Sequence, residues 1–146
     1  MKLFILSLAF FVLNTPPTWH TNFQEAEQLA AKEHKFVLVN FSGSDWCIPC
    51  IKLEKQIFDA DMFAHYADKN LVLVKADFPR LNKNRLSKEQ TELNEKLASQ
   101  YNPHGKFPYT LLIDENGKVV KEWDGLTTNS PDKFIAEVNT VVHAGN

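Results

Sequence analysis

Residues 36–58 read FVLVNFSGSDWCIPCIKLEKQIF, an apolar run followed by a break of small residues and then by two cysteines. The run from Phe36 to Phe41 is β-branched and aromatic with almost no polar side, which predicts a strand covered on both faces. Gly43 and Ser44 interrupt this strand. From about Cys47 onward, apolar residues recur at helical spacing. The segment therefore predicts a strand, a tight loop and a helix, with both cysteines at the start of the helix.

The chain beyond this segment continues to alternate strands and helices. Apolar runs predict strands, and capping residues followed by apolar stripes predict helices. Strands are predicted over 71–76, 109–113 and 119–123. One helix is predicted from a Ser87–Gln90 capping box to Tyr101. A last helix is predicted to begin at Ser130–Pro131 and to reach about Val141. Because Asn116-Gly117 separates the last two strands, we expect them to form an antiparallel hairpin.

A further helix is predicted upstream, from a capping box at Thr21 and Gln24 to about His34. After this helix the order of elements is β-α-β-α-β-β-α. Two right-handed parallel crossovers and a hairpin build a mixed four-stranded sheet with helices on both faces. Ligands of such sheets bind at the carboxyl ends of the parallel strands. The loop after Phe41 lies at such an end and leads to the cysteines.

The N-terminal residues differ in kind from the rest of the chain. Lys2 precedes the apolar run Leu3 to Leu13, which has the pattern of a secretory signal and is too short to span a bilayer. No small-x-small cleavage site follows, so a retained, membrane-associated N-terminus remains an alternative. We expect residues 1–18 to be a signal peptide or anchor, residues 19–146 to be one domain, and the protein to be exported.

Composition argues against nucleic acid as a partner. The 146 residues are 44% hydrophobic, which suits a single domain, and carry a net charge of -2. The aromatic residues are scattered rather than interleaved with Lys and Arg, as a phosphate-binding surface would require. One basic stretch, Arg80 to Lys88, lies in a polar segment and is interpreted as a solvated loop, with contact to a partner left open.

The segment Cys47-Ile48-Pro49-Cys50 carries the chemistry that the sequence predicts. Unpaired N–H groups and the helix dipole favour negative charge in a first helical turn, so we expect the sulfur of Cys47 to ionise more easily than that of a free cysteine. The Cys47 thiolate would attack a disulfide, and Cys50 would resolve the mixed disulfide. Pro49 lacks an N–H, which costs little in a first turn.

Two structural interpretations of the cysteines remain open. A C-x-x-C can be half of a zinc site, but the sequence has no second C-x-x-C and no closely spaced pair among its five histidines, so we expect no metal. A purely structural disulfide is compatible with export, although so small a ring restricts little of the unfolded chain.

Residues Asp45-Trp46-Cys47-Ile48-Pro49-Cys50 resemble the Trp-Cys-x-x-Cys active site of the thioredoxin superfamily. The resemblance covers about residues 36–142 and is strongest to exported bacterial members with Ser-Gly-Ser-Asp-Trp-Cys, here Ser42 to Cys47. It implies a thioredoxin-like α/β fold, a periplasmic location, and thiol–disulfide oxidoreductase activity with catalytic Cys47 and Cys50 and no cofactor. Ile48-Pro49 lacks the histidine common in oxidising and isomerising relatives, which favours a reductase.

The resemblance also implies a substrate-binding surface. It places the family's cis-proline at Pro108, beside which the backbone pairs with a bound peptide in a strand-like way. Cis bonds are cheap only before proline, and a proline that opens a strand suits this use. Phe107 would then face the substrate, Trp46 would offer an apolar platform, and Ile48 and Pro49 would complete the contact surface. Each aromatic residue has the alternative of an ordinary core position.

One residue departs from the family pattern. Thioredoxins hold a buried carboxylate on the strand before the motif, and the matching residue here is Asn40, which accepts no proton at neutral pH. Either Cys50 is then activated differently, for instance through water or Lys75, or the protein turns over slowly in one direction. Asn40 also keeps open a second hypothesis, a non-catalytic binding module with a structural disulfide. Asp45 either caps the helix or moderates the charge beside Cys47.

The expected partners follow from the proposed chemistry. We expect protein disulfides as substrates, and a membrane-linked thiol as the electron donor if the protein is a reductase outside the cytoplasm. We expect the protein to be a monomer.

Overall fold

Five strands among the described residues form one mixed sheet. The computed structural model describes residues 16–144 of the chain. The strands are β1 (Trp19–His20), β2 (Phe36–Ser42), β3 (Leu71–Asp77), β4 (Tyr109–Ile113) and β5 (Val119–Asp124). Their spatial order is β1-β3-β2-β4-β5; the first three are parallel, and β4 runs antiparallel to β2 and β5. The predicted thioredoxin-like α/β class is confirmed.

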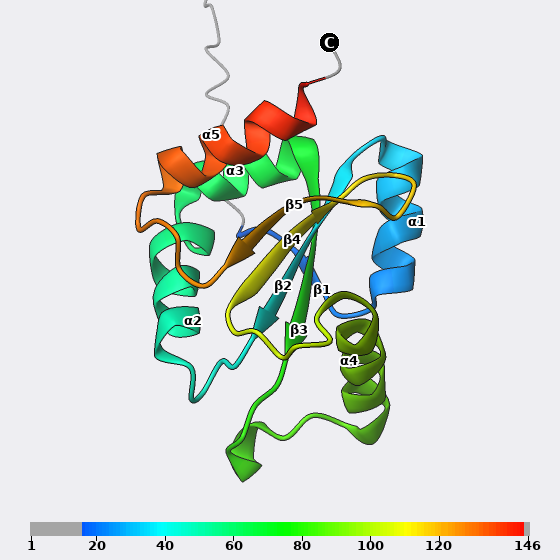
Figure 1. Ribbon diagram of the computed structural model, residues 1–146, viewed down its shortest axis with the longest axis vertical. Helices are drawn as coiled ribbons and strands as arrows, with labels where there is room; N and C mark the ends of the chain where they lie inside the picture. The colour runs from blue at the N-terminus through cyan, green and yellow to red at the C-terminus, as the bar shows by residue number, and fades with distance from the viewer. Residues whose placement is uncertain (1–15, 145–146) are drawn as a thin grey trace, which may run out of the picture.

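Helices cover both faces of the sheet because side chains alternate along its strands. The helices are α1 (Phe23–Glu33), α2 (Ile48–Leu53), α3 (Asp61–Asn70), α4 (Lys88–Tyr101) and α5 (Pro131–Val142). Helices α1 and α4 cover one face of the sheet, and α2, α3 and α5 cover the other (Figure 1). Val37, Val39 and Phe41 of β2 belong to the core on the first face, and Leu38 belongs to the core on the second. The central strands are therefore apolar on both sides, as their sequence predicts.

The prediction of a four-stranded sheet is wrong, because the sheet has a fifth strand at its edge. Trp19 and His20 form β1 and pair in parallel with Leu73 and Val74 of β3. Two residues of mixed polarity give no periodic signal, so only their partner strand identifies them. The predicted start of α1 is also displaced by one residue, because Asn22 rather than Thr21 accepts hydrogen bonds from the free N–H groups of the first turn.

The helix that follows the cysteines is less regular than predicted. After α2, residues Glu54–Phe58 form a π-helical turn, closed by a hydrogen bond from Asp59 N to Glu54 O. The wider turn lets the adjacent side chains of Ile57 and Phe58 both enter the core. Residues Asp61–Asn70, for which the sequence predicts no helix, form the ten-residue helix α3.

The other predicted boundaries are close to those of the structure. Ser87 caps α4, Ser130 precedes Pro131 at the start of α5, and the hairpin of β4 and β5 turns at Gly117, whose φ is 75°. The predicted leader falls mostly on residues 1–15, which lie outside the described residues. Within residues 16–144, no helix has the length and apolarity needed to cross a membrane.

Candidate active site

Cys47 and Cys50 are joined by a disulfide at the start of α2, with their Cα atoms 5.2 Å apart. Cys47 is the N-cap residue of this helix, and its Sγ accepts a hydrogen bond from Cys50 N at 3.3 Å. Cys50 Sγ in turn accepts from Gly43 N at 3.5 Å. Cys47 is 5% exposed and Cys50 is 3% exposed. The two sulfurs therefore lie just beneath the surface, each facing a backbone N–H donor.

Trp46 is held in one position beside the disulfide. Its Nε1 donates to Phe78 O at 2.7 Å, and the guanidinium of Arg80 lies 3.6 Å from the centre of its ring. On the other side, a Cβ at Gly43 would lie 2.4 Å from Cε2 of the ring. Only glycine therefore leaves room for this packing at position 43.

The loop that contains Pro108 meets this motif. The Phe107–Pro108 peptide bond is cis, as the resemblance implies. Phe41 and Tyr109 are register partners in β2 and β4, so Pro108 lies beside the end of β2. The rings of Trp46 and Phe107 are in edge contact, with their centroids 5.5 Å apart. The structure thus brings the motif and the proline loop together.

The remaining predicted contact residues are the most accessible ones. Ile48 is 62% exposed, and Pro49 is also exposed, directly between the two cysteines. Phe107 is half-buried and Pro108 is buried. Among the described residues, the N–H and C=O of Phe107 have no hydrogen-bond partner, whereas Pro108 O accepts from Gly125 N at 2.9 Å. An open backbone edge therefore lies in the loop that contacts Trp46 of the motif.

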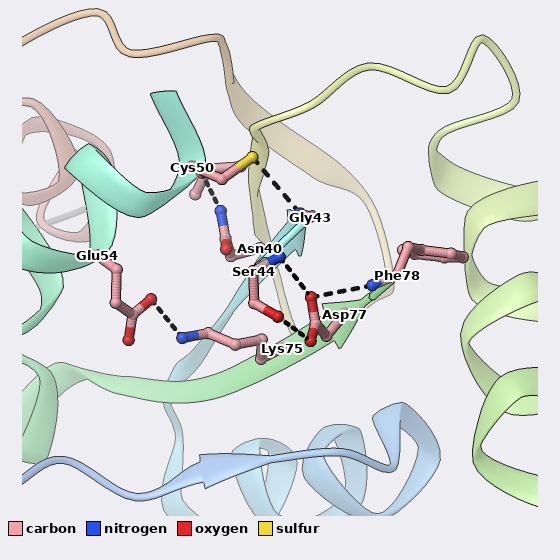
Figure 2. Close-up of polar contacts among 9 residues, drawn as sticks. Asn40, Gly43, Ser44, Cys50, Glu54, Lys75, Asp77 and Phe78 are labelled. Atoms are coloured by element: carbon pink, nitrogen blue, oxygen red, sulfur yellow. Dashed lines mark hydrogen bonds and ion pairs between the residues drawn. The ribbon is translucent and has the colours of Figure 1, made fainter. Parts of the chain in front are cut away.

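A row of polar side chains crosses the sheet on the face that α2 covers. Thr110, Asn40 and Lys75 are register partners on β4, β2 and β3. Asn40 is 2% exposed, and its Nδ2 donates to Thr110 Oγ1 at 3.0 Å. Lys75 donates to the carboxylate of Glu54, one helical turn after Cys50 (Figure 2). The carboxylate that meets this polar row thus comes from the helix rather than from a strand.

Glu54 is a residue that the sequence prediction missed. Its signal was the four-residue spacing from Cys50, which places both on one helical face. The proposed route from Lys75 to Cys50 remains a prediction, because Lys75 is paired with Glu54 and also lies over the ring of Trp19, 4.5 Å from its centre.

Asp45 does not cap the α2 helix, so that interpretation is wrong; Cys47 holds the cap position. The Asp45 carboxylate instead accepts hydrogen bonds from Arg80 N at 2.9 Å, Leu81 N at 3.0 Å and Asn84 Nδ2 at 3.0 Å. These donors, with Arg80 N–H the strongest influence, hold the pKa of Asp45 below its ordinary value. Asp45 therefore fastens the segment after β3 to the cysteine motif.

Tyr109, which follows the cis-proline, is a second perturbed group near the site. Burial, together with the hydrogen bond from its hydroxyl to Glu122 Oε2 at 2.7 Å, raises the pKa of Tyr109 to about 12. The phenol therefore stays neutral at physiological pH and anchors β4 to β5.

No group of three or more His, Cys, Asp or Glu side chains within residues 16–144 is placed to hold a metal ion.

Comparisons with known proteins agree with this geometry. The family described as "Thioredoxin-like domain" matches residues 23–141. A curated protein named "Disulfide bond reductase DsbH" from Chlamydia pneumoniae is 39% identical over 97 residues, which are 66% of this chain and 57% of that protein. The chain thus matches little more than half the length of this relative.

Solved structures give the same result for the fold. A structure titled "DsbH Oxidoreductase" has a TM-score of 0.77 at 30% identity, covering 88% of this chain and 85% of that one. A thioredoxin from Thermus thermophilus has a TM-score of 0.68 at 17% identity, covering 90% and 92% of the two chains, and shows likeness of fold alone.

Proposed function

Since the chain belongs to the thioredoxin-like domain family, we propose that it is a thiol–disulfide oxidoreductase that reduces protein disulfides through Cys47 and Cys50. The observation that carries the proposal is the position of Cys47 Sγ at the N-cap of α2, where it accepts from Cys50 N. A negative sulfur is favoured there by the N–H donors and by the helix dipole. The similarity to a disulfide bond reductase supports the same chemistry.

The reaction is two successive thiol–disulfide exchanges. In the reduced protein, the Cys47 thiolate attacks one sulfur of the target disulfide; the target S–S bond breaks and the other target sulfur leaves as a thiolate. Cys50 then attacks Cys47 Sγ, which releases the second target thiolate and forms the Cys47–Cys50 bond. Two electrons pass to the target, and the structure corresponds to the oxidised product. A dithiol donor must reduce this bond before the next cycle.

The substrate surface of the proposal consists of Trp46, Ile48, Pro49, Phe107 and Pro108. Ile48 and Pro49 are exposed beside the sulfurs, and the free backbone groups of Phe107 suit strand-like pairing with an extended peptide. Trp46 and Phe107 form an apolar wall through their edge contact.

We place the protein outside the cytoplasm, in the periplasm, because a signal-like run opens the sequence and a disulfide reductase is a relative. A membrane-linked thiol is the electron donor that this location calls for. We also propose that the protein acts as a monomer and needs no cofactor.

A second function is favoured by two observations, namely the burial of both cysteines and Asn40 in place of a buried carboxylate. In this alternative the protein is a peptide-binding module, and its disulfide is structural.

Turnover separates the two functions. The protein is mixed with dithiothreitol and a test protein that has one accessible disulfide, and Cys47→Ser serves as the matched control. The oxidoreductase accelerates reduction over the reagent alone, and Cys47→Ser does not. Equal rates for wild type, Cys47→Ser and reagent alone would support the binding module.

A further inference from the structure

The segment between β3 and α4 carries a concentration of positive charge. We call this segment, together with Lys88 at the start of α4, the basic loop (residues 78–88); it contains Arg80, Lys83, Arg85 and Lys88 and no acidic residue. In Figure 1 the basic loop projects beyond the carboxyl end of the sheet, next to the connection from β2 to α2. The whole chain, by contrast, has a net charge of -2. Four of the 16 Lys and Arg residues of the chain therefore lie in this one short loop.

The basic loop is fastened to the cysteine motif at several points. Asp45 accepts from the backbone of Arg80 and Leu81, and Trp46 Nε1 donates to Phe78 O. At the base of the loop, Asp77 Oδ1 accepts from Ser44 N at 2.9 Å (Figure 2). Three consecutive residues before Cys47 thus hold the start of the loop and keep its backbone beside the cysteine motif.

The charges of the basic loop are available for a partner. Arg80, Lys83 and Arg85 are exposed, and none of them forms an ion pair with another residue of the described part of the chain. Lys88 differs, since it lies 3.8 Å from Glu92. Two carboxylates on the motif side of the loop, Asp45 and Asp77, accept hydrogen bonds from backbone N–H groups.

Apolar contact area accompanies this charge. Leu81 is 48% exposed on the loop and Ile48 is 62% exposed on the motif, and both belong to the few large hydrophobic side chains that the described residues expose. Exposed apolar side chains with a charged rim are typical of protein-binding surfaces.

From this arrangement, and resting on the proposed function, we propose that the substrates are polypeptides with acidic side chains close to the reactive disulfide. Cations beside an apolar contact steer acidic partners and fix their orientation, mainly through the association rate. Arg80 lies over Trp46, so an acidic residue that it binds would lie within reach of the Cys47 sulfur.

The test uses two cyclic peptides that share one intramolecular disulfide and differ only in flanking residues, three Glu in one and three Gln in the other. Rates are divided by those with dithiothreitol alone, which removes differences in disulfide stability. At about 0.02 M salt we expect kcat/KM of the wild type to be roughly tenfold higher for the Glu peptide. At about 1 M salt, where the Debye length is ~3 Å, the preference should disappear.

The variant Lys83→Glu/Arg85→Glu removes two cations without touching Trp46 or the backbone donors to Asp45. We expect it to lose the preference for the Glu peptide and to keep its rate with the Gln peptide. The matched control, Lys69→Glu/Lys118→Glu, changes the same charge at the opposite end of the sheet, where α3 ends and β4 turns into β5. This control should keep the preference.

Each other outcome overturns the inference. Equal rates for both peptides in the wild type, or an undiminished preference in Lys83→Glu/Arg85→Glu, would refute acidic recognition while leaving the oxidoreductase intact. Failure to reduce either peptide would refute the proposed function itself. If the preference is absent and the basic loop instead binds phosphatidylglycerol vesicles or a second copy of the chain in sedimentation, the charge serves that partner.

Discussion

Asp45 links the cysteine motif to the basic loop through one carboxylate. Its pKa is lowered because it accepts from Arg80 N–H, Asn84 and Leu81 N–H. A depressed pKa means that these bonds are complete above the ordinary value of 3.8 and are lost as the pH falls through the lower folded value. We therefore expect the amide NMR shifts of Arg80 and Leu81 to titrate with a midpoint below 3.8.

Asp45→Asn is the control for this titration, because an amide does not ionise in this range. The two amide shifts should then show no midpoint. A wild-type midpoint at or above the ordinary value would contradict the assigned hydrogen bonds.

Asn40 is neutral at a position that is 2% exposed. Asn40→Asp would place a carboxyl there, and burial would raise its pKa, since Lys75 is already paired with Glu54. The folded state would then bind more protons than the unfolded state above about pH 4, so stability would fall as pH rises. We expect the loss of unfolding free energy, relative to wild type, to grow from pH 4 to pH 8 and to reach about 3 kcal/mol.

Urea denaturation of the oxidised proteins at both pH values measures this difference. Asn40→Leu, which has no titrating group, should show the same loss at both pH values. A pH-independent penalty in Asn40→Asp would mean that the residue is solvated or paired.

The loop between β2 and α2 depends on one contact between its ends. Gly43→Ala would place a Cβ 2.4 Å from the Trp46 ring, so the ring must move away from Phe78 and Arg80. We expect a destabilisation of about 1 to 3 kcal/mol and a shift of the tryptophan fluorescence of this loop.

A double-mutant cycle identifies the cause. In a Trp46→Ala background, Gly43→Ala should cost little, because the obstructing ring is gone. An equal cost in both backgrounds would assign the penalty to the backbone instead.

The helices α4 and α5 both follow a serine, but only one serine side chain acts as a cap. Ser87 Oγ accepts from Gln90 N at 3.1 Å, whereas Ser130 Oγ accepts from no backbone N–H of α5 and donates to the Asp132 carboxylate instead. We expect Ser87→Ala to cost about 1 kcal/mol and Ser130→Ala clearly less. Thermal unfolding of the two variants checks this, and equal costs would contradict it.

Sequence reasoning found the elements whose signals are local. Some elements are specified by residues within them, and these were predicted correctly. Examples are the apolar run of β2, the Asn116-Gly117 turn and the Ser87 cap. The strand β1 and the π-helical turn were missed because they depend on partners elsewhere in the chain. The same holds for the site. The cysteine pair was evident from its spacing, whereas the hydrogen bonds between Asp45 and residues 80–84 could be found only from the structure.

At the scale of the molecule, the fold brings residues that are distant in the sequence together on one surface. The motif at 45–50, the basic loop and the loop before Pro108 meet at the carboxyl end of β2 and β3. The sheet between two helical layers holds these three segments in fixed relative positions. A covalent reaction with a large polypeptide needs such a preorganised surface more than it needs a deep pocket.

The central claim is that Cys47 attacks and Cys50 resolves, and trapping tests it most directly. Cys50→Ser and Cys47→Ser are each incubated, reduced, with a disulfide protein that the wild type reduces, and the products are separated without reductant and weighed by mass spectrometry. We predict that Cys50→Ser accumulates a mixed disulfide through Cys47 and that Cys47→Ser accumulates almost none. A mixed disulfide mainly on Cys50, or none in either variant, would contradict the account.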